Sequence, residues 1–359
     1  MSKSTGNVID PLDMIDKYGA DALRMTLAAL STQGRDILLS PGKIETYRFF
    51  MNKLWNAARF ALMNLDDAEE AAEIKIDPAR LRLQDRWILA RVQEVVENET
   101  RLIDEYDIGA AARQLYDFVW GDLCDWYLEM SKPALKGDEG EERRKAAQAV
   151  LDEVFRTLLP LLHPFIPFVT EELWEAFGYG QSVMKAAWPK AKDEYRFGVQ
   201  DAMRDVQGAV RSLRNLRAEA HIAPQQWMNK AAIRIDRSET AEALKEALPL
   251  VSMLCRVKDI EVLPASEPRP SASLSSVFGE GEISLHVGDV LNIGAEVARL
   301  KQDLEAVEKT VAASRARLDK PNFLARAPRE VVEKERARVS EGEAQMSRLR
   351  ENLQSLQGT

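Results

Sequence analysis

The chain has 359 residues, of which 45% are hydrophobic and 30% charged, a composition typical of globular proteins and a length that predicts two or three domains. No apolar run is long enough to cross a membrane, and the N-terminal MSKSTGNVIDP has neither the basic nor the apolar region of a signal peptide. The net charge of −9 argues against a uniformly basic nucleic-acid-binding protein. Two distant cysteines and three scattered histidines predict no metal site, and the low number of cysteines fits a reducing cytoplasm.

The first part of the chain predicts helices joined by short connections. Residues 1–10 form a loop rich in Ser, Gly and Asn, and Asp10-Pro11 then begins a helical pattern that extends to residue 30 with a break near Gly19. Apolar residues recur at helical spacing in the segments 43–65, 83–106, 109–132, 141–162 and 168–177. Helices of this length pack as an antiparallel bundle, whose core we expect to hold Trp87, Trp120, Trp126, Tyr127 and Trp174.

Strands and helices alternate beyond residue 195. The pattern predicts helices over 201–220 and 239–254. Strands are expected over 231–235, 260–264, 275–278 and 282–286, the last two as a hairpin. This alternation indicates a small α/β junction domain.

The last segment follows a heptad pattern. Apolar positions repeat without a gap from Val297 to Leu318 and again from Val332 to Leu356, the second run with two imperfect positions. Pro321 and Pro328 cannot lie inside either helix, so we expect an antiparallel coiled-coil hairpin that projects as an arm. Residues 309–338 carry nine basic and four acidic side chains, which places a local charge of +5 on an acidic chain.

The N-terminal loop suits polyphosphate, because a lysine beside hydroxyl and amide donors can hold phosphate oxygens. Its continuation, MSKSTGNVIDPLDMIDKYGADALRMTLA, resembles the KMSKS loop and following helices of class I aminoacyl-tRNA synthetases. Within that class, GRDI (34–37), KLWNAARF (53–60), LLPLLHPFIPFVTEELWEAF and NFLARAPREVVEKERARV (322–339) are similar to the valyl family. The isoleucyl and leucyl families share the KMSKS-to-bundle layout and remain alternatives, although two cysteines cannot supply the four-cysteine zinc cluster of many isoleucyl enzymes.

The resemblance implies a mainly α fold with four parts. These are the KMSKS loop and following helices at the end of the catalytic region (1–30), an antiparallel helical bundle of the class I anticodon-binding type (31–190), the α/β junction domain (195–292) and the coiled-coil tRNA-binding arm (293–359).

It also implies a role for the loop. Lys3 would bind ATP phosphates and stabilise the charge of the leaving pyrophosphate, with Ser2 and Ser4 donating hydrogen bonds nearby. The family's reaction joins valine to tRNA(Val) at the expense of ATP, with Mg, in the full-length enzyme. Its other catalytic motifs and its editing domain precede this loop, so we expect the chain alone to bind tRNA without forming an adenylate and to hold no cofactor tightly.

In the family, the bundle recognises the anticodon. The segment 43–65 supplies Lys43, Lys53, Asn56, Arg59 and Phe60, and we expect Phe60 to stack on an anticodon base. The alternative is that Phe60 belongs to the core and the others are ordinary surface.

In the family, the arm lies against the outer corner of tRNA. Arg315, Arg317, Arg326 and Arg329 are therefore expected to contact phosphates and to raise affinity for many tRNAs alike. One alternative is a dimerising coiled coil, although we expect a monomer; another is a non-catalytic helical interaction module that binds no tRNA.

Overall fold

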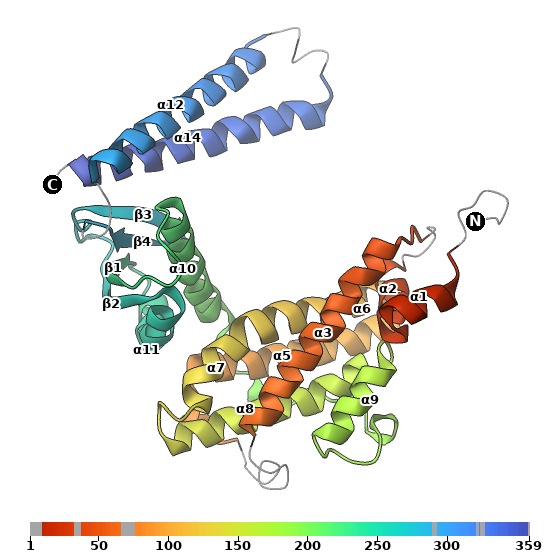
Figure 1. Ribbon diagram of the computed structural model, residues 1–359. Helices are drawn as coiled ribbons and strands as arrows, with labels where there is room; N and C mark the ends of the chain where they lie inside the picture. The colour runs from red at the N-terminus through yellow and green to blue at the C-terminus, as the bar shows by residue number, and fades with distance from the viewer. Residues whose placement is uncertain are drawn as a thin grey trace. The chain divides into compact units, whose positions relative to one another are not determined.

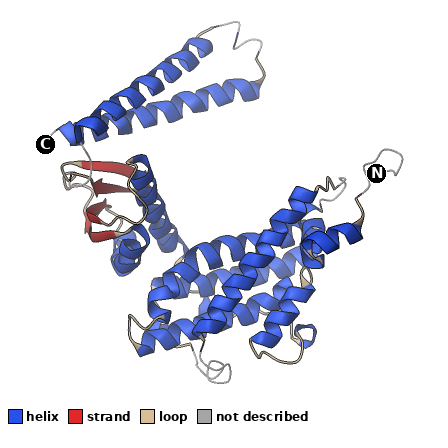
Figure 2. Ribbon diagram, viewed as in Figure 1, coloured by secondary structure: helices blue, strands red, loops and turns tan. Residues whose placement is uncertain are grey.

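The computed structural model describes residues 9–31, 37–65, 76–288, 293–320, 323 and 327–357. The chain divides into two compact units, 1–201 and 202–359 (Figure 1). The first is helical, and the second combines helices with a sheet (Figure 2). The mainly α fold is confirmed, whereas the division into four parts stays a prediction. Among the described helices, none is long and apolar enough to cross a bilayer.

The helices expected in the first unit are all present, with boundaries shifted by a few residues. They are α1 (Pro11–Tyr18), α2 (Ala20–Leu30), α3 (Pro41–Asn64), α5 (Leu83–Asp104), α6 (Ile108–Asp117), α7 (Leu128–Leu135), α8 (Glu141–Leu162) and α9 (Pro167–Ala176). Short 3-10 turns lie at η2 (Pro78–Arg80), η4 (Val183–Lys185) and η5 (Asp193–Tyr195). A π-helical segment, η3 (Phe118–Tyr127), joins α6 to α7.

Local chemistry explains how α1 and α2 begin and end. The Asp10 side chain accepts a hydrogen bond from the backbone N–H of Leu12 and caps α1, whose first residue is proline. Gly19 adopts φ +92°, a conformation that glycine tolerates and most residues do not. It therefore separates the two helices at the predicted break.

Close packing joins α2 to α6 at Gly109. A Cβ atom at Gly109 would lie 2.1 Å from the Ser31 carbonyl oxygen, so only glycine allows this approach. Arg113, one turn further on, donates to the Ala29 carbonyl at 2.6 Å and satisfies an acceptor at the end of α2. The bundle is thereby joined to the helices that follow the N-terminal loop.

The aromatic core agrees with expectation at four of the five positions. Trp87, Trp126, Tyr127 and Trp174 are buried. Trp120 is only half-buried, so its assignment to the core was wrong. Trp120 lies in the π-helical segment η3, whose wider turn changes which side chains face inward.

The second unit contains a four-stranded sheet in the order β2-β1-β4-β3. Its strands are β1 (Met228–Arg234), β2 (Val257–Leu263), β3 (Ser273–Phe278) and β4 (Gly281–His286), and its helices include α10 (Gln200–Glu219) and α11 (Ser238–Cys255). β1 pairs with β2 in parallel through the α11 crossover, and β3 and β4 form the predicted antiparallel hairpin. All expected elements of the junction domain are confirmed.

The predicted coiled-coil hairpin consists of α12 (Ile293–Leu318) and α14 (Arg329–Gln357), which pack against each other (Figure 1). The two imperfect heptad positions of α14 are Glu335 and Gly342, and both are buried. Glu335 bonds the buried Ser314 hydroxyl of α12. A Cβ atom at Gly342 would lie 2.3 Å from a Val311 methyl group, so the absence of a side chain accommodates that valine. A polar pair and a small residue in the seam set the register of the two helices.

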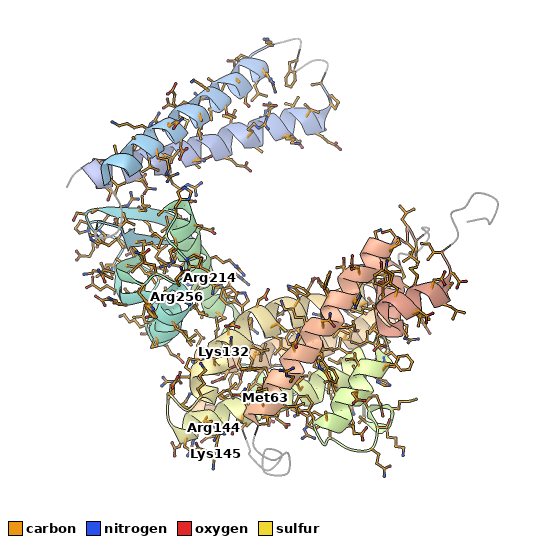
Figure 3. The ribbon with its side chains drawn as sticks, in the orientation of Figure 1. Met63, Lys132, Arg144, Lys145, Arg214 and Arg256 are labelled. Carbon is orange, nitrogen blue, oxygen red and sulfur yellow. The ribbon has the colours of Figure 1, made fainter. Side chains whose placement is uncertain are left out.

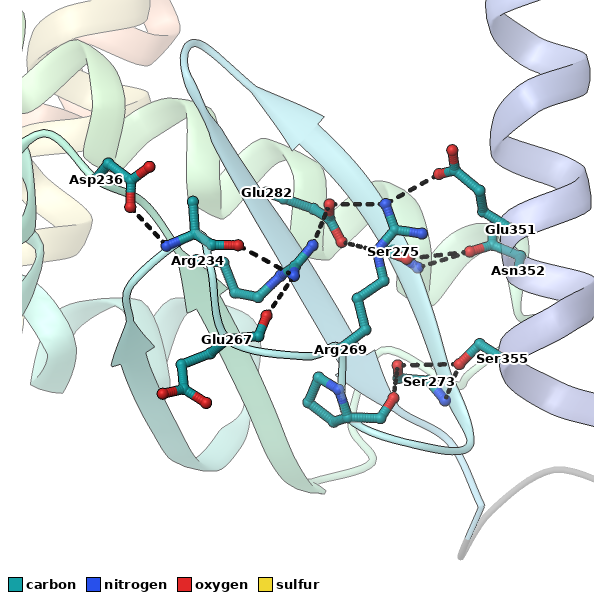
Figure 4. Close-up of polar contacts among 12 residues, drawn as sticks. Arg234, Asp236, Glu267, Arg269, Ser273, Ser275, Glu282, Glu351, Asn352 and Ser355 are labelled. Carbon is teal, nitrogen blue, oxygen red and sulfur yellow. Dashed lines mark hydrogen bonds and ion pairs between the residues drawn. The ribbon is translucent and has the colours of Figure 1, made fainter. Parts of the chain in front are cut away.

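The C-terminal end of α14 covers the free edge of β3 (Figure 4). The Asn352 Oδ1 atom accepts from the Ser275 backbone N–H at 2.9 Å and from its hydroxyl at 3.3 Å. The Ser273 backbone N–H donates to the Ser355 hydroxyl at 3.3 Å. Two of the edge N–H groups that could otherwise recruit another strand are thus satisfied.

Candidate nucleic-acid interface

Helix α3 carries most of the contact residues predicted in the first unit. Pro41 occupies its first turn, and its inner side buries Ile44, Phe50, Leu54, Ala57, Ala58 and Ala61. Its outer side is exposed at Arg48, Phe49, Asn52, Trp55, Asn56, Arg59 and Met63. This outer side, called the α3 face below, combines guanidinium, amide and aromatic groups on one rigid helix.

The five predicted residues of this helix differ in their exposure. Asn56 and Arg59 lie on the α3 face. Lys43 is exposed in the first turn of α3, where its Nζ donates to the Leu38 carbonyl at 2.8 Å. Phe60 is half-buried, because it lies between the α3 face and the inner side.

Lys53 points towards the π-helical segment η3. Its Nζ lies 2.6 Å from the Asp125 Oδ1 atom and 3.8 Å from the centre of the Trp120 ring. The carboxylate compensates the ammonium charge, and the ring holds it by a cation–π interaction. Lys53 therefore has less charge available for a phosphate than the exposed Arg59 of the same helix.

The most exposed aromatic rings of α3 are not the predicted one. Phe49 is 57% exposed and Trp55 is 41% exposed, whereas Phe60 is half-buried. The sequence offered a signal, because Trp55 stands one helical turn before Arg59, but periodicity alone did not separate it from the core aromatics. A base can stack more readily on Trp55 than on Phe60.

Cys124 and Tyr116 lie in the same part of the bundle as Lys53 and Asp125. Burial raises the pKa of the Cys124 thiol to about 12 although the positive charge of Lys53 opposes this rise. The thiol is therefore protonated at neutral pH and a poor nucleophile. Burial also raises the pKa of the Tyr116 hydroxyl. Across the described part of the chain, no three His, Cys, Asp or Glu side chains form a group that could hold a metal ion.

Cationic side chains lie beyond the C-terminal end of the α3 face. Gln148 of α8 donates to the Asn64 carbonyl at 2.7 Å, which fixes the start of α8 next to the end of α3. Arg144 and Lys145 lie about one turn earlier on α8, in the region of Met63 (Figure 3). Met63 is 74% exposed. The sequence reading did not select these residues, since they lie far from α3 along the chain.

In the arm, two of the predicted arginines pair with glutamates of the other helix. Arg315 pairs with Glu343, and the Arg317 Nη1 atom lies 3.1 Å from the Glu335 carboxylate. Arg329 is exposed at the start of α14, and Arg326 lies outside the described residues.

Further basic residues of α14 were counted in the charged segment but not selected as contacts. Lys334 and Arg336 are exposed, and among the described residues no carboxylate pairs with either of them or with Arg329. These three cations are better placed to meet phosphates than the ion-paired Arg315 and Arg317.

The loop residues Ser2, Lys3 and Ser4 lie outside the described residues. The structure describes the helices that follow them, with the core of Tyr18, Ala22, Leu23 and Ile44 joining α1, α2 and α3.

Comparisons with known proteins match three parts of the chain. Residues 1–40 match the model for class I tRNA synthetases (I, L, M and V), residues 85–233 match the anticodon-binding domain of tRNA ligases, and residues 292–357 match the valyl tRNA synthetase tRNA binding arm. Valine–tRNA ligase of Syntrophotalea carbinolica is 40% identical over 99% of the chain. The chain belongs to the valyl-tRNA synthetase family. The match to the valyl arm distinguishes it from the isoleucyl and leucyl families.

Other relatives in the valyl family agree. The valine–tRNA ligases of Nitratidesulfovibrio vulgaris and Thermotoga maritima are 42% and 38% identical, each over 99% of the chain. The chain spans 40% of the length of each of these three relatives. A solved complex of a leucyl enzyme from Agrobacterium radiobacter K84 has 23% identity and a TM-score of 0.42, covering 55% of this chain and 23% of that one.

Proposed function

We propose that this chain is a tRNA-binding part of a valine–tRNA ligase and that the α3 face reads the anticodon of tRNA(Val). The observation that carries the proposal is the α3 face itself. An exposed tryptophan, two exposed asparagines and two exposed arginines lie on a helix whose other side is fully packed. Unstacked RNA bases are recognised by aromatic rings, guanidinium planes and side chains that bond base edges.

Within this site, roles follow from exposure and pairing. Trp55 provides the main stacking surface, and Phe60 provides a second, half-buried one. Asn56 and Arg59 bond base edges or phosphates. Lys53, held by Asp125, orients the neighbouring segment more than it attracts RNA.

The test uses an RNA stem–loop with the valine anticodon. Trp55→Ala is expected to weaken its binding by about tenfold, since base–aromatic stacking is worth ~1–3 kcal/mol per base. Phe60→Ala is expected to weaken it less. The matched control is Tyr106→Asn, which removes another exposed ring from the same unit. Asparagine tolerates the local backbone φ of +59° at this position. Equal affinities for the parent chain and the Trp55 and Phe60 variants would refute the assignment.

We further propose that the arm adds sequence-independent affinity for tRNA. Arg329, Lys334 and Arg336 contact phosphates, while Arg315 and Arg317 mainly hold the two helices together. Neutralising the first three should flatten the salt dependence of tRNA binding, because fewer counterions are released. Neutralising Arg315 and Arg317 should mainly lower the melting temperature; the opposite pattern would reverse the assignment.

For the full-length ligase, we propose that Lys3, Ser2 and Ser4 hold the phosphates of ATP, with Mg, during activation of valine. Lys3→Ala in that enzyme should abolish ATP–pyrophosphate exchange and leave tRNA affinity unchanged. The chain alone should bind tRNA as a monomer and show no exchange. Exchange by the chain alone, or normal exchange by the Lys3 variant, would contradict the proposal.

A further inference from the structure

The C-terminal end of α14 makes polar contacts with the junction domain at β3 and Arg269. α14 covers the outer edge of β3, whereas α12 faces the same strand across a cleft of about 370 Å³. The cleft is lined from β3 by Leu274 and Ser276 and from α12 by Leu300 and Val307. The polar contacts of α14 are therefore the ones that can fix the direction of the arm from the sheet.

The central contact is made by Asn352. Its side chain is 7% exposed, and its Oδ1 atom accepts both the backbone N–H and the hydroxyl of the buried Ser275. Because the side-chain oxygen of Asn352 accepts this edge N–H, another strand cannot pair with β3 at this point. The same bond holds α14 at a fixed position along β3. One turn on, Ser355 bonds the next outward N–H, that of Ser273, at 3.3 Å, and its carbonyl accepts from the Ala272 N–H.

A charged bridge reinforces the same end of the arm (Figure 4). Arg269 lies 2.6 Å from the Glu282 carboxylate of β4 and 3.0 Å from the Glu351 carboxylate of α14. Arg234 of β1 lies 2.7 Å from the Glu282 carboxylate, so that carboxylate is shared by two guanidinium groups. The side chain of Glu282 is only 15% exposed, which strengthens these pairs relative to surface ones.

We propose that the contacts of α14 with β3 and Arg269 set the direction of the arm for tRNA, and that Asn352 is the positioning residue of this attachment. An arm whose direction is already fixed loses little conformational freedom when it binds RNA. Because the arm and the bundle belong to one chain, the phosphate contacts of the arm then form at a high effective concentration. This inference rests on the proposed tRNA-binding function.

The decisive variants differ in one acceptor atom. Asn352→Leu keeps the approximate size of the side chain and removes the acceptor, whereas Asn352→Asp keeps the acceptor for Ser275. Glu351→Gln weakens the Arg269 bridge at a half-exposed position and remains informative if Asn352→Leu fails to fold.

Two measurements separate positioning from general stability. The first is the distribution of distances between spin labels placed at Ala337 of α14 and Lys258 of β2, both exposed. We expect Asn352→Leu to broaden it and Asn352→Asp to restore it. The second compares whole tRNA(Val) with the anticodon stem–loop: Asn352→Leu should weaken tRNA binding by about tenfold and leave stem–loop binding unchanged.

The outcomes are distinct. A distribution as narrow in Asn352→Leu and Glu351→Gln as in the parent chain overturns the inference, as does unchanged tRNA affinity in a variant with a broadened distribution. If the parent chain binds neither RNA, the proposed function fails, and the label distances still decide whether Asn352 fixes the arm.

Discussion

Glu99 of α5 is a buried carboxylic acid whose ionisation opposes folding. Its side chain has no exposed surface, and burial raises its pKa from 4.5 to about 7, although a hydrogen bond from Gln114 at 3.2 Å works in the other direction. Between these two values the folded chain keeps a proton that the unfolded chain has released. Stability therefore falls as pH rises through this window, and the full penalty is reached above the folded-state pKa.

The magnitude follows from the shift in pKa. A difference of about 2.5 units at ~1.36 kcal/mol per unit gives a penalty of about 3 kcal/mol at pH 8 and less than about 1 kcal/mol at pH 5. Glu99→Gln keeps the shape of the side chain and cannot ionise. We expect its free energy of unfolding, relative to the parent chain, to improve by about 2 kcal/mol between pH 5 and pH 8.

Urea unfolding followed by tryptophan fluorescence measures this difference, because all tryptophans except Trp227 lie in the first unit. Comparing the two pH values cancels any constant effect of the new amide. Glu105→Gln, an exposed position after the same helix, is the matched control and should show a much smaller pH-dependent gain. Parallel pH profiles for the parent chain and Glu99→Gln would show that the ionisation of Glu99 does not oppose folding.

Three other substitutions test the packing. Gly342→Ala should destabilise the hairpin by about 1–3 kcal/mol, although alanine normally favours helices, because its Cβ meets a Val311 methyl group. Adding Val311→Ala should recover part of this loss in a double-mutant cycle of thermal unfolding. Gly109→Ala should lower the urea midpoint of the first unit by a similar free energy, because its Cβ meets the Ser31 carbonyl; an unchanged midpoint would show that the helices can separate freely. Asp21→Ala, which removes the side chain that accepts two N–H groups at the start of α9, should cost about 1–2 kcal/mol by the same assay, and no loss would mean that water replaces the cap.

Much of the architecture could be predicted because apolar periodicity and breakers are local. The break at Gly19, the start of the first helix at Asp10-Pro11 and the hairpin of β3 and β4 each depend on residues close in sequence. The half-buried position of Trp120 was not predicted, because a π-helical segment changes which side chains face the core without changing the amino-acid composition.

The heptad pattern predicted the hairpin but not what fixes its register. In the sequence, Glu335 and Gly342 interrupt the apolar heptad pattern. The structure explains both, because Glu335 bonds Ser314 of α12 and Gly342 leaves room for Val311.

The candidate site shows the same limit. Lys53, Arg315 and Arg317 were expected to meet RNA because of their charge, but each has a carboxylate partner on another helix. Conversely, Trp55 is exposed because the fold turns that side of α3 outward, which periodicity alone did not resolve. Residue type predicted the kind of chemistry, whereas pairing and exposure depend on contacts distant in sequence.

Anticodon reading by the α3 face is tested most directly by a binding titration of this chain with tRNA(Val) and with an isoleucine tRNA at two salt concentrations. We expect tighter binding of tRNA(Val) at both concentrations, with a similar loss of affinity for both RNAs as salt rises, because the α3 face reads bases and the arm contacts phosphates. Equal affinities for the two tRNAs at both concentrations would contradict anticodon reading by the α3 face.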